Sequence, residues 1–178
     1  MKHLAARSPF LLAGLVLGAA CGSDDSASPS GSSAVVINEI VPSNKGTCTD
    51  EAGGYADWLE LYNKSDTVVD LGGYSLTDNP AVPRKAVLPA GLILAPKGVL
   101  TFWADGATTE GTTHLPFKLS AAGEGISLFD AAGKQVDQYT WPTSVTDISF
   151  ARLPDGTGAF VSCAKPTCGT ANGATCTP

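Results

Sequence analysis

Residues 57–63 read Asp-Trp-Leu-Glu-Leu-Tyr-Asn, so apolar and polar side chains alternate along them. Because successive side chains of a β-strand point to opposite faces, Leu59 and Leu61 are predicted to face one side, with Glu60 and the aromatic residues beside it on the other. The β-branched run Val-Val-Ile-Asn-Glu-Ile-Val at 35–41 predicts a second strand. These two segments point to an all-β fold.

The rest of the folded region repeats this pattern in short pieces separated by turns rich in Gly, Pro, Asn and Asp. No stretch combines a 3.6-residue period with helix-forming residues over three turns. Roughly seven to nine strands at about ten-residue intervals predict a two-sheet antiparallel sandwich, with a closed barrel as the alternative. The further predicted strands are 68–71, 74–77, 86–88, 99–103, 125–129, 136–139 and 148–153.

The composition excludes several classes of protein. Of the 178 residues, 43% are hydrophobic, which is enough to build a core. Only 16% are charged, fewer than helical bundles and coiled coils carry. The net charge of −6 and the pI near 4.7 argue against an electrostatic grip on nucleic acid, so no nucleic-acid partner is predicted.

The first 20 residues are predicted to be a secretory leader. Lys2 and Arg7 precede a short apolar run at 10–17, followed by small residues. The run is too short to span a membrane. The stretch Leu-Gly-Ala-Ala-Cys at 17–21 resembles the lipobox of bacterial lipoproteins, although Gly18 stands where that motif prefers leucine. The resemblance implies a lipid attached to Cys21; an ordinary cleavage site near residue 20 is the alternative.

Residues 21–34 are predicted to be the lipidated cysteine and a flexible Gly/Ser-rich linker. Loss of residues 1–20 leaves nine basic against 17 acidic side chains, a net charge of −8. Gly22 and Ser23 follow the cysteine, where inner-membrane lipoproteins tend to carry Asp. The expected location is therefore the outer membrane or cell surface, with a lipid anchor in the membrane. A folded domain at 35–173 and a tail at 174–178 complete the predicted organisation.

Four cysteines remain for disulfides: Cys48, Cys163, Cys168 and Cys176. An even number in an exported chain indicates two bonds, with three possible pairings. Cys48–Cys163 with Cys168–Cys176 is the favoured pairing. A zinc site is disfavoured because no Cys-x-x-Cys pair and no nearby histidine are present.

The order of short motifs resembles the bacterial form of the lamin tail domain family. It includes Asp-Trp-Leu-Glu-Leu-Tyr-Asn at 57–63, Asp-Leu-Gly-Gly-Tyr-Ser-Leu-Thr-Asp at 70–78 and Arg-Leu-Pro-Asp-Gly at 152–156. The resemblance covers essentially all of 35–173. It implies an immunoglobulin-like β-sandwich, which in relatives often serves as an attachment or adhesion module. The chain lacks a coiled-coil rod and is acidic, so filament formation and DNA binding do not carry over.

Two glutamates and one histidine are the candidates for acid–base chemistry. Glu39 and Glu60 suggest either a paired-carboxylate glycosidase or, as we favour, structural carboxylates held by Arg84, Arg152 or Lys118. His114 is predicted to be a loop or strand-end residue without a catalytic role. No catalytic residue is predicted.

No metal or other cofactor is predicted either. The carboxylates of Asp50, Glu51 and Asp57 lie in a Gly-rich loop and are weak calcium candidates. Among the large aromatic side chains, Trp141 is predicted to be the exposed one. The sequence thus favours a non-enzymatic envelope lipoprotein that binds an unidentified envelope or extracellular protein or polysaccharide. A calcium-dependent carbohydrate-binding module and a small secreted metal-dependent hydrolase are the alternatives.

Overall fold

The computed structural model describes residue 1, residues 33–173 and residue 176. Cys21 and most of the predicted leader and linker lie outside these residues. The described part of the chain forms eleven strands, and every ladder between them is antiparallel. They are β1 (Val35–Val41), β2 (Asp57–Asn63), β3 (Val69–Asp70), β4 (Ser75–Thr77), β5 (Ala86–Val87), β6 (Ile93–Leu94), β7 (Val99–Ala104), β8 (Glu124–Phe129), β9 (Gln135–Trp141), β10 (Ser149–Leu153) and β11 (Ala159–Cys163).

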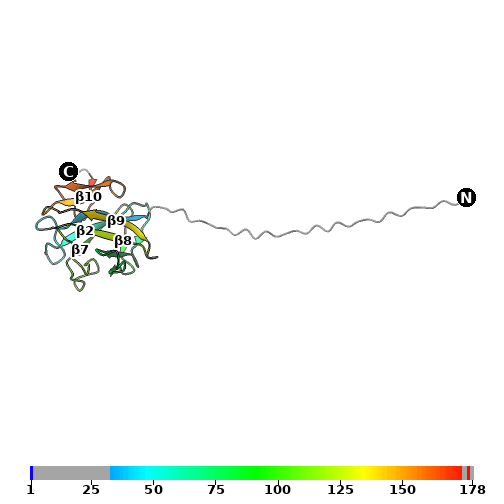
Figure 1. The fold of residues 1–178 in the computed structure, drawn as a ribbon, viewed down its shortest axis with the longest axis horizontal. Coiled ribbons are helices and arrows are strands. Elements are labelled where there is room, and N and C mark those ends of the chain that lie inside the picture. Colours follow the sequence, from blue (N-terminus) through cyan, green and yellow to red (C-terminus); the bar gives the residue numbers. More distant parts are fainter. Residues whose placement is uncertain (2–32, 174–175, 177–178) are drawn as a thin grey trace. The chain divides into compact units, whose positions relative to one another are not determined.

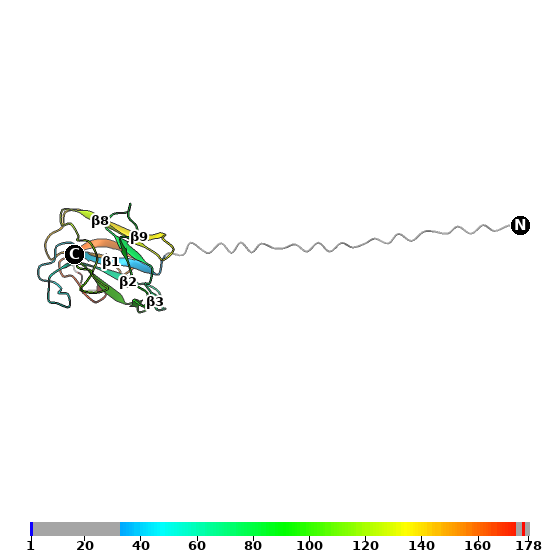
Figure 2. The same cartoon turned by 90° about the horizontal axis from the view of Figure 1, so that it is seen from below.

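Two larger sheets make the fold (Figure 1). One has the strand order β11-β10-β1-β2-β7, the other β5-β4-β8-β9, and β3 pairs with β6 in a small third sheet. Figure 2 shows β8 and β9 in one layer and β1 and β2 in the other. The all-β class and the immunoglobulin-like sandwich are therefore confirmed.

The strand count exceeds the prediction because β6 and β11 were missed. With two residues, β6 is too short to show a period. The other strand, β11, lies at the edge of its sheet, and its side chains are mostly half-buried or exposed, so no apolar alternation marks it.

The two faces of β2 have different surroundings, as its alternation predicts. Leu59 and Leu61 point into the main core between the sheets. Trp58 points the other way and packs with Val41 and Trp103 in a separate cluster on the outer face of the five-stranded sheet. The outer face of the five-stranded sheet therefore also carries buried side chains, in addition to the face that lines the main core.

A β-bulge at Asn38 interrupts the alternation of side chains along β1. The register with β2 shifts between Ile37 and Glu39, and the extra residue puts both Ile37 and Ile40 in the core. Asn38 is held by Asp155, which accepts a hydrogen bond from Nδ2 at 2.7 Å. Glu39 is thereby placed opposite Glu60 in the ladder.

Residues 164–173, here called the C-terminal segment, lie over the outer face of the five-stranded sheet. After β11 the chain runs across β1 to β2, where Gly169 contacts Glu60, and then returns toward β10, where Asn172 contacts the Arg152 carbonyl oxygen. This path determines the disulfides, and the favoured pairing was wrong. The bonds are Cys48–Cys168 and Cys163–Cys176, with Cα–Cα distances of 6.0 and 5.1 Å.

Candidate functional site

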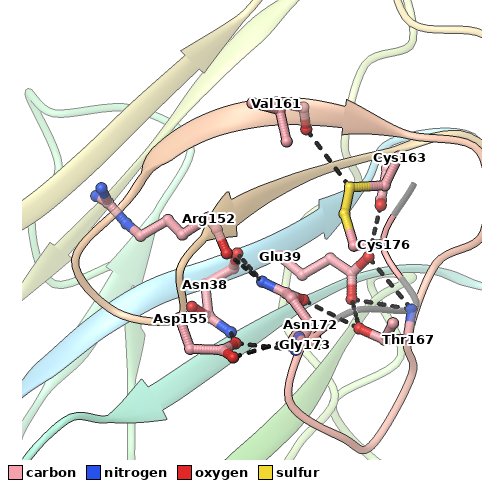
Figure 3. The surroundings of a disulfide bond; sticks show 11 residues. Asn38, Glu39, Arg152, Asp155, Val161, Cys163, Thr167, Asn172, Gly173 and Cys176 are labelled. Atoms are coloured by element: carbon pink, nitrogen blue, oxygen red, sulfur yellow. Dashed lines mark hydrogen bonds between the residues drawn. A yellow bond between two sulfur atoms is a disulfide. The ribbon is translucent and has the colours of Figure 1, made fainter. Parts of the chain in front are cut away.

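The outer face of the five-stranded sheet contains a pair of buried carboxylates. Glu39 and Glu60 are Cα partners in the β1–β2 ladder, and neither is exposed to solvent. Oε1 of Glu39 accepts a hydrogen bond from the Ser149 hydroxyl at 2.5 Å. Oε2 accepts bonds from the backbone N–H and the hydroxyl of Thr167, at 3.1 and 2.7 Å (Figure 3). Glu39 therefore binds the C-terminal segment to the sheet.

Glu60 makes fewer contacts than Glu39. Its Oε1 accepts hydrogen bonds from the Gly169 N–H at 2.5 Å and from the Thr101 hydroxyl at 2.9 Å. Its Oε2 is buried with no hydrogen-bond partner among the described residues. Burial raises the pKa of Glu60 to about 8, and the negative charge of Glu39 contributes to this rise. Glu60 is thus mostly protonated at neutral pH.

The expectation that cations hold these carboxylates was wrong. The hydrogen bonds that Glu39 and Glu60 accept within the described residues come from hydroxyl and backbone N–H groups. Burial raises the pKa of Glu39 above its ordinary value as well. A paired-carboxylate glycosidase needs access for a sugar chain, so that its two carboxyl groups can flank the glycosidic bond. Here the C-terminal segment occupies the space above them, so the arrangement supports a structural role.

Arg152 is instead paired with Asp137 of β9. Its Nη2 lies 2.8 and 3.0 Å from the two carboxylate oxygens of Asp137, and its Nε donates to the Ile37 carbonyl oxygen at 2.8 Å. The Ile37 N–H donates to the same aspartate at 2.8 Å. These contacts join the two sheets at one side of the sandwich.

The same side of the sandwich carries two edge strands. β9 pairs only with β8, and β11 only with β10. Tyr139 of β9 stacks on Phe160 of β11 with ring centroids 3.7 Å apart, and the Arg152 guanidinium lies 4.4 Å from the Phe160 ring. The free edge of β7, by contrast, is covered, because Trp103 exchanges backbone hydrogen bonds with Thr113 and Leu115. We call β9 and β11 together the open side.

The three weak calcium candidates serve different purposes. Asp50 accepts hydrogen bonds from the N–H groups of Ala52 and Gly54, within its own turn. Asp57 accepts one from the Asn44 N–H at 2.9 Å. Glu51 is directed at His114. Their carboxylates do not form a group of metal-ligand spacing in the part of the chain that the structure describes.

His114 is more deeply buried than a loop residue was expected to be. Its Nδ1 lies 2.6 Å from Oδ2 of Asp105, and its Nε2 lies 3.3 Å from Oε2 of Glu51. Burial lowers the pKa of His114, but the hydrogen bonds and negative charges of Asp105 and Glu51 outweigh this, and the net pKa is raised. Glu51 precedes the histidine by 63 residues, so no local motif could have predicted this contact.

Trp141 is also buried, which corrects the prediction that it is the exposed aromatic. It ends β9 pointing inward, and its Nε1 donates to the Ser120 carbonyl oxygen at 2.9 Å. A sugar-stacking platform on Trp141 is therefore ruled out. Within the described residues, no helix is long and apolar enough to cross a membrane.

The sandwich, with its covered outer face and its open side, defines an immunoglobulin-like module. The family model of the lamin tail domain matches residues 28–143, and the chain belongs to this family. No curated protein matches the chain. The family match ends before β10 and β11, although β10 lies between β1 and β11 in the sheet. Residues beyond the match therefore complete the sandwich.

Proposed function

We propose that this chain is a non-enzymatic envelope lipoprotein whose lamin tail domain binds a partner through the open side formed by β9 and β11. The observation that carries the proposal is this pair of strand edges on one side of a scaffold whose buried acids make internal contacts. An unpaired strand edge presents N–H and C=O groups that can pair with an extended segment of another molecule.

The two disulfides support the exported location. Such bonds form and persist in oxidising compartments and are rare in the cytosol. The lipobox-like stretch ending at Cys21 and the Gly/Ser-rich linker after it fit a domain tethered to a membrane by lipid. The likeness to a lipoprotein and the disulfides are independent of each other, and both indicate export.

The chemistry of the open side indicates the class of partner. Its solvent-exposed side chains are uncharged, with Gln138 and Thr140 on β9 and Ser162 on β11. An uncharged polar edge suits an extended segment of an envelope or extracellular protein, or a polysaccharide. The net charge of −8 expected for the mature chain disfavours nucleic acid.

Site-directed crosslinking in intact cells tests the binding surface. A photo-reactive amino acid is placed at Gln138 or Ser162 on the open side, and at the exposed residue Val82 as a matched control. We expect a discrete adduct from the first two positions and none from Val82. Equal labelling from all three positions, or none from Gln138 and Ser162, would refute binding at this side.

Mass spectrometry of the mature N-terminus tests the anchor. We expect a lipid-modified Cys21 at the N-terminus and release of the Cys21→Ser variant into the soluble fraction. An unmodified Cys21 thiol in a membrane-free protein would refute the lipoprotein assignment without bearing on the binding surface.

A further inference from the structure

The small β3–β6 sheet has one face in the core and the other in solvent. Val69 and Leu94 are Cα partners that turn inward, since Leu94 belongs to the main core and Val69 packs against it. Because successive side chains of a strand point to opposite faces, the residues on either side of this pair turn outward. These four residues, here called the outward face, are Val68, Asp70, Ile93 and Ala95.

The outward face is mostly apolar. Val68 and Ile93 are 58% and 53% exposed. The register makes them diagonal neighbours across the β3–β6 ladder, a distance that large side chains can bridge. Ala95 and the residue that follows it, Pro96, are also exposed. Single exposed apolar side chains are common on protein surfaces, whereas a contiguous group of them indicates a contact surface.

This face lies at the end of the domain at which β1 begins. The Asn63 side-chain amide donates to the carbonyl oxygens of Thr67 and Ala95, at 2.7 and 3.0 Å, so it ties both strands of the small sheet to the end of β2. The next residue, Lys64, donates its N–H to the Ala34 carbonyl oxygen at 2.8 Å, directly before β1. Figure 2 shows β3 at this end of the domain. The outward face therefore adjoins the point at which the predicted linker joins the fold.

The length of the predicted linker sets how far this end can be from a membrane. Ser33 lies twelve residues after Cys21, so the chain between them spans at most about 40 Å. A Gly/Ser-rich segment of this length has an average end-to-end distance of roughly 20 Å. Tethering at such a distance produces an effective concentration of about 1 mM. Contacts too weak to bind a free domain are then sufficient to orient a tethered one.

The charges around the outward face favour a lipid surface over most of the domain's other surfaces. Residues 63–73 and 92–99 contain two lysines and two aspartates, so this region is neutral. Nζ of Lys97 lies 3.2 Å from a carboxylate oxygen of Asp66. The mature chain as a whole is expected to carry a net charge of −8. Because anionic phospholipids give a bilayer a negative surface potential, a neutral apolar region approaches it against less repulsion than an acidic one.

We propose that the outward face of the β3–β6 sheet docks on the phospholipid bilayer, with Val68 and Ile93 inserted at the boundary between headgroups and acyl chains. The inference rests on the lipid anchor of the proposed function. A second copy of the chain is not the expected occupant, because two strands of two residues offer far less than the roughly 800 Å² that each partner of a stable dimer buries. The outward face shares no residue with β9 or β11, so docking and partner binding are tested separately.

Methyl NMR of the tethered mature chain tests the docking. Cys21 is coupled to a maleimide phospholipid in phosphatidylcholine–phosphatidylglycerol nanodiscs; the other four cysteines are paired in disulfides. Spin labels on the acyl chains broaden the resonances of methyl groups that enter the bilayer. The control is Val145, which is 67% exposed, in a loop held to Ser43 beyond the other end of β1. We expect at least fivefold stronger broadening at Val68 and Ile93 than at Val145.

Substitutions make the test specific to the outward face. Val68→Asp is expected to lower the broadening of the Ile93 methyl groups at least fivefold, whereas Val145→Asp, the matched control, leaves it unchanged. Both variants retain the fold because these side chains are exposed. Equal broadening at all three positions, no broadening, or broadening at Ile93 that Val68→Asp leaves unchanged overturns the proposal. Shifts of the Val68 and Ile93 resonances with protein concentration, in the absence of lipid, overturn it in favour of a second copy.

The chemical tether separates this outcome from that of the lipoprotein assignment. The maleimide lipid supplies an anchor whether or not cells modify Cys21. An unmodified Cys21 in the protein from cells would refute the native anchor without changing the nanodisc result. Absence of docking in the nanodiscs would overturn the present proposal and leave the anchor and the open side unaffected.

Discussion

Replacing Glu60 by glutamine should make the stability of the domain much less dependent on pH. Glutamine keeps the shape of the side chain and the Oε1 acceptor that Gly169 and Thr101 use. It removes the ionisable group, whose second oxygen is buried without a partner among the described residues. The substitution therefore isolates the free-energy cost of ionising a carboxyl group beneath the C-terminal segment.

The size of the effect follows from the two pKa values of Glu60, about 8 in the folded protein and 4.5 as the ordinary value. Between these values the folded state binds more protons than the unfolded state, so the free energy of unfolding falls as pH rises. The stabilising contribution is complete below pH 4.5 and lost above about pH 8. At ~1.4 kcal/mol for each pH unit, the loss is on the order of 4–5 kcal/mol, of which roughly 3 kcal/mol falls between pH 5 and 8.

The assay is urea unfolding of both proteins at several values from pH 5 to 8, with the disulfides intact. The wild-type protein is expected to lose roughly 3 kcal/mol more than Glu60→Gln across this range. Asp66→Asn, which removes a charge at an exposed position, should follow the wild type. Parallel decline of the wild type and Glu60→Gln would show that Glu60 is ionised in the fold and that the reasoning from burial is wrong.

Three further substitutions test the packing of the sandwich. Asp137→Asn removes the charge that faces Arg152 and should lower the free energy of unfolding in urea by about 2–3 kcal/mol. The matched control is Asp78→Asn, in the more exposed pair with Lys85, which should lower it by less than about 1 kcal/mol. The Cys48–Cys168 bond joins residues 120 apart in sequence, and Cys163–Cys176 joins residues 13 apart. Because closing a longer loop restricts the unfolded chain more, removing the first bond should destabilise the fold by about 1–2 kcal/mol more than removing the second. Equal losses would contradict this reasoning. Gly158→Ala places a Cβ inside the van der Waals contact distance of the Leu153 carbonyl group and should abolish cooperative thermal unfolding, while Gly46→Ala, with its nearest neighbour at 3.5 Å, should leave the Tm almost unchanged.

Features that depend on near neighbours could be predicted from the sequence. The alternation along 57–63 correctly places Leu59 and Leu61 in the core, because the two-residue period is a local property. The run at 35–41 gives the bounds of β1 because the preference of β-branched residues for strands is a local property as well. The bulge at Asn38 could not be predicted, because the Asp155 carboxylate that holds it lies 117 residues further along the chain.

The candidate sites depend on the path of loops, which local patterns do not encode. The disulfide pairing follows from the return of the C-terminal segment across the sheet. Three cysteines close together in sequence do not determine that path, so they do not determine which of them pairs with Cys48. The surroundings of His114 combine Asp105, nine residues away, with Glu51 from a distant loop. Asp105 and Glu110 lie close to His114 in sequence, so the sequence offers a signal for their contacts with it. Glu51 lies far from His114 in sequence and offers no such signal.

The cover over Glu39 and Glu60 is made by the segment that follows β11. A variant truncated before Thr167 retains the residues of all eleven described strands but loses the cover over both glutamates and the disulfide partner of Cys48. The strands and their cover can therefore be separated by a single truncation, which would leave the Cys48 thiol unpaired and two carboxyl groups without their backbone N–H donors.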